Sequence, residues 1–153
     1  MSYPEEGFIN ALKSKHPDLQ ISPDILDKNK ISIMAKAENI SDIAFALRND
    51  FGFTHPTACG AVDYPNENRM QLIYYLMNPD NKLVLFLRVN LDRTDPHIVS
   101  LTNVWDAMSF HEREAHEMFG IDFFGHPNLT PLLLPPDWKG GYPLRKDFKG
   151  EGL

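Results

Sequence analysis

SFHEREAHEMFGIDFFGHPNLTPLLLPPDWKGGYPLRKDF, residues 109–148, is the stretch that decides how this chain is organised. It begins with a charge-dense run, HEREAHE, which favours a short helix at 110–119. Pro and Gly then recur too often for a helix to restart. The stretch also carries more large aromatic groups than a solvated tail holds, namely Phe119, Phe123, Phe124, Trp138, Tyr142 and Phe148. We therefore expect a helix that leads into an extended arm, part of which lies against another protein.

Length and composition are those of one soluble globular domain. The 153 residues are 42% hydrophobic and 24% charged. The formal net charge of −6 argues against a nucleic-acid binder and against a polybasic membrane surface. The single cysteine, Cys59, excludes an internal disulfide, a cysteine-ligated iron–sulfur cluster and a CxxC redox pair, and it indicates a reducing compartment.

Membrane segments are not expected. The N-terminal residues, MSYPEEGF, lack the charged region and the apolar run of a signal peptide. No window approaches the eighteen or so apolar residues that a membrane-spanning helix needs. We expect the chain to contact a membrane only through a complex.

Hydrophobic spacing before residue 109 predicts alternating helices and strands. The expected elements are a helix from Pro4 to about His16, a connector to about Lys30, a strand at Ile31–Ile33, a helix from Asn39 or Ser41 to Phe51 that Gly52 ends, a strand at Thr54–Val62, a hairpin of Gln71–Met77 with Leu83–Leu91, and a helix through Leu101, Val104, Trp105 and Met108. This order predicts a two-layer α+β domain, 1–121, with a mainly antiparallel sheet and helices on one face. An extended docking arm, 122–153, follows it.

The run HEREAHE does not match a zinc-protease helix. His111 and His116 are five residues apart, which separates them by roughly 140° around a helix, so they cannot share one ion. The pairs Glu112–His116 and Arg113–Glu117 have the spacing that stabilises a helix. A solvated charged face is the simpler interpretation, but the flanking Phe and Met residues favour a surface that meets a partner, where an Arg could hold a carboxylate.

No residue set in the sequence supports independent chemistry. We expect His126 and His55, each before a Pro, to bond backbone and fix a turn. Asp137 and Asp147 have no evident partner carboxylate, which leaves no basis for general acid–base catalysis. PLRKDF, residues 143–148, alternates apolar and cationic groups. It fits a docking segment better than a tail packed on its own domain, although both remain open.

At this point the residues resemble a known family. EREAHEMFGIDFFGHPNL, followed by LLLPPDW and PLRKDF, is similar to the C subunit (NuoC) of NADH:quinone oxidoreductase, respiratory complex I, in which EREVYDMFGIxFxGHPDLRRIL…PxDW…HPLRKDYP is typical. The likeness is dense over 109–148 and looser through the hairpin. This sequence departs from the pattern at His116-Glu117, at Pro131-Leu132-Leu133 and at Gly141-Tyr142.

The resemblance implies a non-catalytic structural subunit in the peripheral arm of a redox-driven, ion-translocating oxidoreductase, on the cytoplasmic face of the membrane. It implies no cofactor in this chain. Iron–sulfur clusters and quinone would belong to partners, which are a large hydrogenase-like (NuoD-type) subunit and iron–sulfur (NuoB- and NuoI-type) subunits. The motif and interface residues that carry over are Glu112, Arg113, Glu114, Phe119, Gly120, His126, Pro127, Trp138, Leu144, Arg145, Lys146, Asp147 and Phe148.

Two alternatives stay open on sequence. The first is the equivalent subunit of a membrane-bound, energy-converting nickel–iron hydrogenase, because related subunits occur there and in archaeal pumps that oxidise a reduced deazaflavin. The second is a metal-dependent hydrolase that uses His111, His116 and His126. The electron donor and the acceptor cannot be read from these residues.

Overall fold

Five strands form one mixed sheet in the order β1-β2-β5-β4-β3 in a computed structural model that describes residues 4–150. The β2–β5 pair is parallel and the other three pairs are antiparallel. The elements are α1 (Pro4–Lys15), β1 (Ile21–Asp27), β2 (Lys30–Ala35), α2 (Ile40–Phe51), β3 (His55–Tyr64), β4 (Arg69–Met77), β5 (Val84–Asp92), β6 (His97–Val99), α3 (Met108–Phe119) and β7 (Asp122–Phe124), with short 3-10 turns at Ala37–Asn39 and Pro65–Glu67.

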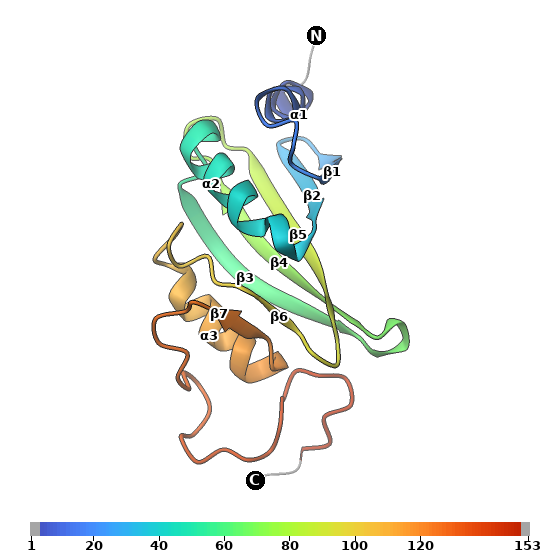
Figure 1. Cartoon of the computed structure of the whole chain (residues 1–153), viewed down its shortest axis with the longest axis vertical. Coiled ribbons are helices and arrows are strands. Elements are labelled where there is room, and N and C mark those ends of the chain that lie inside the picture. The colour runs from blue at the N-terminus through green and yellow to red at the C-terminus, as the bar shows by residue number, and fades with distance from the viewer. Residues whose placement is uncertain (1–3, 151–153) are drawn as a thin grey trace.

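Helices α2 and α3 form a second layer over one face of this sheet, and α1 and the arm lie toward opposite ends of the long axis (Figure 1). Strand alternation explains the choice of face: Leu85, Leu87 and Val89 of β5 are fully buried, whereas Arg88 and Asn90 point the other way. Apolar residues of α2 and α3 close the same core. The predicted two-layer α+β fold with a mainly antiparallel sheet is confirmed.

The end of α2 is tied to the β4–β5 turn. Gly52 ends the helix in the left-handed region at φ 71°, as predicted. The buried side chain of Asn78 then donates from Nδ2 to the carbonyl of Phe51 (2.7 Å), and its Oδ1 accepts the amide of Asp80 (2.8 Å). One side chain therefore serves both a helix end and a hairpin turn.

Three local predictions are wrong. The expected connector before Lys30 contains β1, an edge strand that pairs with β2. The expected helix through Leu101–Met108 is instead a pair of turns, in which Trp105 donates its amide to Leu101 and Met108 to Trp105. Apolar residues at three- and four-residue steps are buried equally well by successive turns. His55, expected to fix a turn, is instead the first residue of the strand β3.

The first residues of the expected arm join the body of the protein. Asp122–Phe124 form β7, which pairs in parallel with β6. Phe119 and Phe123 are buried in the chain's own core, so their own domain supplies the surface they need, whereas Phe124 stays 55% exposed. The place of Phe119 in a partner interface stays a prediction. The domain boundary at 121 stays a prediction.

We expect Asn78→Ala to lower the free energy of unfolding by about 1–3 kcal/mol, because a buried carbonyl and two turn amides lose their partner. Urea titration followed by circular dichroism measures the loss. The exposed Asn10 provides the matched control, and Asn10→Ala should change stability by less than about 0.5 kcal/mol. Equal losses in the two variants would contradict this role of Asn78.

Candidate functional site

Glu117 of α3 holds the middle of the arm in place. Its carboxylate accepts the backbone amides of three successive leucines, Leu132 (2.9 Å), Leu133 (2.7 Å) and Leu134 (3.2 Å). Burial raises the pKa of Glu117, but the three amide donors outweigh this effect and the pKa lies below its usual value. The arm from 125 to 150 contains no helix or strand, so this anchor substitutes for regular structure.

Arg113 fixes the adjoining part of the arm. Its guanidinium donates to the carbonyls of Thr130 (3.0 Å) and Pro131 (2.8 Å) and to the hydroxyl of Thr130 (3.2 Å). The predicted helix pairs, Glu112–His116 and Arg113–Glu117, form no salt bridge in the part of the chain that the structure describes. Each of these side chains is hydrogen-bonded to backbone instead, and the charge of Arg113 still adds to the lowering of the Glu117 pKa.

PLRKDF returns to the C-terminal end of α3. The amide of Leu144 donates to the carbonyl of Met118 (3.1 Å), and Arg145 Nε donates to the carbonyl of Phe119 (2.7 Å). These carbonyls have no partner within the helix, and a cation beside them is favourable. Gly120, at φ 76°, lets the Tyr142 ring approach so closely that an added Cβ would lie 2.5 Å from it.

A buried carboxylate of the sheet binds the same segment. Asp63 of β3 forms a bidentate pair with Arg93 (2.6 and 3.0 Å) and accepts the amide of Lys146 (2.9 Å). Arg93 also pairs with Asp147 (3.0 Å). The Arg93 guanidinium holds the pKa of Asp63 below its usual value. Asp147, expected to be isolated, is therefore paired within its own chain.

Glu112 lies in the core. Its side chain is fully buried and accepts the hydroxyl of Ser100 (2.5 Å) and the amide of Leu101 (2.7 Å). Burial raises the pKa of Glu112 to about 7, against the lowering effect of those two bonds. Its part in a partner interface stays a prediction, but the carboxylate itself is enclosed by its own domain.

His126 and His116 form hydrogen bonds with backbone groups. His126 accepts the amide of Asn128 at Nδ1 (3.0 Å) and donates from Nε2 to the carbonyl of Ser109 (3.0 Å), which confirms that it fixes a turn. His116 Nδ1 bonds the carbonyl of Ile121 (2.8 Å). Among residues 4–150 no group of three His, Cys, Asp or Glu could hold a metal ion, so the hydrolase that needs His111, His116 and His126 is contradicted.

The remaining motif residues lie on or near the surface. Glu114, Pro127, Leu144 and Lys146 are exposed, and Trp138 and Phe148 are half-buried with their ring centroids 6.3 Å apart. Sequence reasoning missed Asp63 and Arg93, because nothing local marks two charged residues thirty positions apart as a pair. It also missed the role of Glu117, although this residue stood in the run that was singled out.

Exposed apolar side chains concentrate around α3 and the arm. Nine large hydrophobic residues of the described chain are exposed, and five of them lie within 109–148: Phe110, Phe124, Leu133, Tyr142 and Leu144. Phe110 and Leu133 are each 61% exposed. Because this segment is only about a quarter of the chain, the apolar surface marks it as the candidate site.

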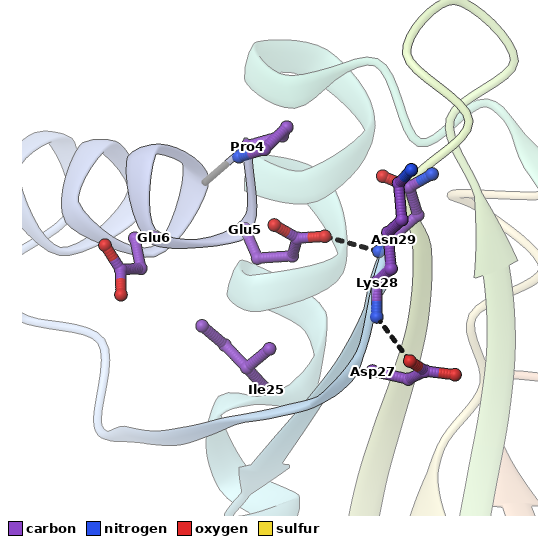
Figure 2. Close-up of a pocket in the computed structure, with 7 residues that line it drawn as sticks. All are labelled: Pro4, Glu5, Glu6, Ile25, Asp27, Lys28 and Asn29. Atoms are coloured by element: carbon purple, nitrogen blue, oxygen red, sulfur yellow. Dashed lines mark hydrogen bonds between the residues drawn. The ribbon is translucent and has the colours of Figure 1, made fainter. Parts of the chain in front are cut away.

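A separate hollow of about 470 Å³ lies between the start of α1 and the β1–β2 turn. Figure 2 shows that Glu5 reaches across it to the amide of Asn29 and that Asp27 accepts the amide of Lys28. Glu5 thus ties α1 to the hairpin, whereas the bond of Asp27 lies within the β1–β2 turn. We assign the hollow a structural role.

Gly120→Ala should displace the end of the arm, because its Cβ would collide with Tyr142 and disturb Arg145. Gly125→Ala is the matched control, since Gly125 has φ 80° but no atom near its Cβ position, so both variants share the backbone strain of about 1 kcal/mol. We expect faster tryptic cleavage at Lys139 and Lys146 in Gly120→Ala alone. Equal cleavage in the two variants would show that the contact with Tyr142 does not hold the arm.

Because of Glu112, the free energy of unfolding should fall as the pH rises from about 5 to 8. Between 4.5 and about 7 the folded state keeps a proton that the unfolded state has released, so raising the pH favours unfolding. Glu112→Gln should remove this dependence, which amounts to at most about 3 kcal/mol. Urea unfolding at pH 5 and pH 8 tests it against the exposed control Glu114→Gln. Parallel pH profiles for the native chain and Glu112→Gln would refute it.

No described helix has the length and apolar character needed to cross a bilayer.

The solved structures include a chain from the membrane-bound sulfane sulfur reductase, described as an archaeal respiratory membrane complex. It matches with a TM-score of 0.85 and 23% identity over 95% of this chain and 86% of that one, which shows a shared fold.

Relatives with closer sequences span nearly the whole chain. The C subunit of the NADH-quinone oxidoreductase of Moorella thermoacetica is 34% identical over 94% of this chain and 95% of its own length. The C subunit of the F420H2 dehydrogenase of Methanosarcina mazei is 32% identical over 94% of this chain and 90% of its own length. The family model of the respiratory-chain NADH dehydrogenase 30 kDa subunit matches residues 33–153. The chain therefore belongs to the respiratory-chain NADH dehydrogenase 30 kDa subunit family, which is the NuoC family of complex I-type oxidoreductases.

Proposed function

We propose that this chain is a non-catalytic assembly subunit in the peripheral arm of a complex I-type, ion-translocating oxidoreductase that delivers electrons to quinone or a similar membrane carrier. The observation that carries the proposal is that the polar side chains of the site are hydrogen-bonded within the chain. Glu117, Arg113, Asp63 and Arg145 all bond backbone or side chains of the arm. They shape a surface, and none faces a substrate-binding cavity as a free acid or base.

The exposed side of the same segment supports a protein partner. Phe110, Leu133 and Leu144 are each at least half exposed on a segment whose backbone is fixed from beneath. A fixed apolar surface loses little conformational entropy when it is buried. We propose that it packs against the large hydrogenase-like (NuoD-type) subunit and adjacent iron–sulfur (NuoB- and NuoI-type) subunits, which would hold the clusters and the quinone site. The chain would sit peripherally on the cytoplasmic face of the membrane.

A second candidate differs only in the electron donor. The Methanosarcina mazei relative is named as part of an F420H2 dehydrogenase, and its identity to this chain is almost that of the NADH-quinone oxidoreductase relative. An assembly role in a complex that oxidises reduced F420 is therefore equally compatible with these contacts. The donor would be determined by other subunits.

Affinity purification of the tagged chain from detergent-solubilised native membranes tests the proposal. We expect a large subunit and iron–sulfur subunits in the eluate, with iron in the complex and none bound by the separated chain. NADH and reduced F420 are then compared as donors for the complex. A chain that elutes alone from intact complexes would refute the assembly role.

Arg113→Ala should impair assembly more than folding. The substitution releases the arm at Thr130 and Pro131 but removes nothing from the core, so the isolated chain should lose only about 1 kcal/mol. The fraction of chain retained in the purified complex should fall several-fold. Arg48→Ala, at an exposed position of α2, is the control and should leave retention unchanged. If Arg113→Ala lowers the thermal stability of the isolated chain but leaves its retention in the complex unchanged, Arg113 serves the fold alone.

A further inference from the structure

We propose that the hollow between α3 and the arm, hereafter the Trp138 hollow, receives a large apolar side chain from a partner protein segment that also carries a carboxylate. This inference rests on the proposed function and specifies the chemistry of the contact. The hollow has a volume of about 290 Å³. It is lined by His116, Glu117, Leu129, Pro131, Leu134, Pro135, Pro136, Trp138, Lys139, Gly141 and Tyr142.

The lining is apolar where an occupant would be buried. Leu129, Leu134 and the rings of Trp138 and Tyr142 supply carbon surface, and the prolines add more without offering amide donors. Two of its polar groups are already bonded, since Glu117 accepts three amides and Trp138 Nε1 donates to the carbonyl of Gly141 (2.8 Å). An apolar side chain that enters the hollow leaves both of these bonds in place.

Contacts within the chain already fix the residues that line the Trp138 hollow. Glu117 holds the Leu132–Leu134 side, and Arg113 holds the backbone at Pro131. Tyr142 is clamped between Gly120 and the Arg145 guanidinium, which lies 4.6 Å from its ring centroid. Because the hollow is preorganised, little ordering entropy is lost when a partner binds.

Charge around the hollow selects an acidic partner. Lys139 lines it, and a second hollow of about 420 Å³, which shares Gly141 and Tyr142, has Arg145, Lys149 and Asp147 as its charged lining. None of these three cations forms a salt bridge with an acid of residues 4–150. Of the acids nearby, Glu117 lines the first hollow but is bonded to backbone amides, Asp147 lines the second but is paired with Arg93, and Asp137 is exposed. The cations that line the two hollows therefore outnumber the acids that line them by three to two.

The surroundings favour a protein segment over a small ligand. The hollow is at the lower limit of ligand-pocket volumes, and no buried polar group of the described lining is left free to orient a small molecule. Leu133 and Leu144 of the same arm extend the apolar surface. Apolar anchors ringed by charge are typical of a protein interface, in which complementary charges determine the choice of partner.

Site-specific crosslinking identifies the occupant. Pro136 lines the hollow and is exposed, so p-benzoylphenylalanine at this position would sample whatever lies there in the native complex. After irradiation, mass spectrometry should find a crosslink to another protein of the complex, at a segment with Asp or Glu within three residues of a large apolar residue. A crosslink only within this chain, or to a segment without acids, would overturn the proposal.

Charge reversal tests the electrostatic part. The double variant Lys139→Glu/Lys149→Glu should be retained in the complex at least tenfold less than the native chain during a salt wash. The control Lys13→Glu/Lys28→Glu reverses two exposed lysines at the other end of the molecule and should match the native chain. If the variant Lys139→Glu/Lys149→Glu is retained as well as the native chain, the acidic partner is refuted and the assembly role stands. A native chain that never enters a complex would refute both.

Discussion

The carbonyl groups at the C-terminal end of α3 are the constraint that determines the path of the arm. A helix that ends inside a protein leaves carbonyls without intrahelical partners, and here the chain itself supplies the partners. Gly120 turns the backbone away, and some twenty-five residues later Leu144 and Arg145 return to bond Met118 and Phe119. The arm is therefore a continuation of the helix cap, and its path follows from that requirement.

Carboxylates do the rest of the positioning by accepting backbone amides. Glu117 and Asp63 each bind backbone amides of the arm, and Glu112 binds the segment just before α3. Hydrogen-bond donors favour the charged form of Glu117 and Asp63, whereas burial raises the pKa of Glu112 to about 7. The family is one of oxidoreductase subunits, and among residues 4–150 no group of three His, Cys, Asp or Glu could hold a metal ion.

Sequence reasoning recovered most of the sheet because its signals are local. The alternation in β5, the turn at Asn78 and the helix stop at Gly52 each lie within a few residues. It failed at β1, where Pro and Asp hide an edge strand, and at 101–108, where turns imitate a helical repeat. The candidate site contains motif residues that the sequence singled out, but the Asp63–Arg93–Lys146 cluster joins three distant parts of the chain. Only folding brings such residues together, so no sequence window reveals them.

The bond between Asp63 and the Lys146 amide spans eighty-three positions, and this separation orders events during synthesis. When the ribosome has completed the five-stranded sheet, the acid that will hold the arm is already in place, but the arm has not been made. Contacts between such distant positions close late, since local structure forms first. A nascent or truncated chain would thus carry a finished sheet but lack the exposed apolar side chains of Leu133, Tyr142 and Leu144 until translation has passed the arm.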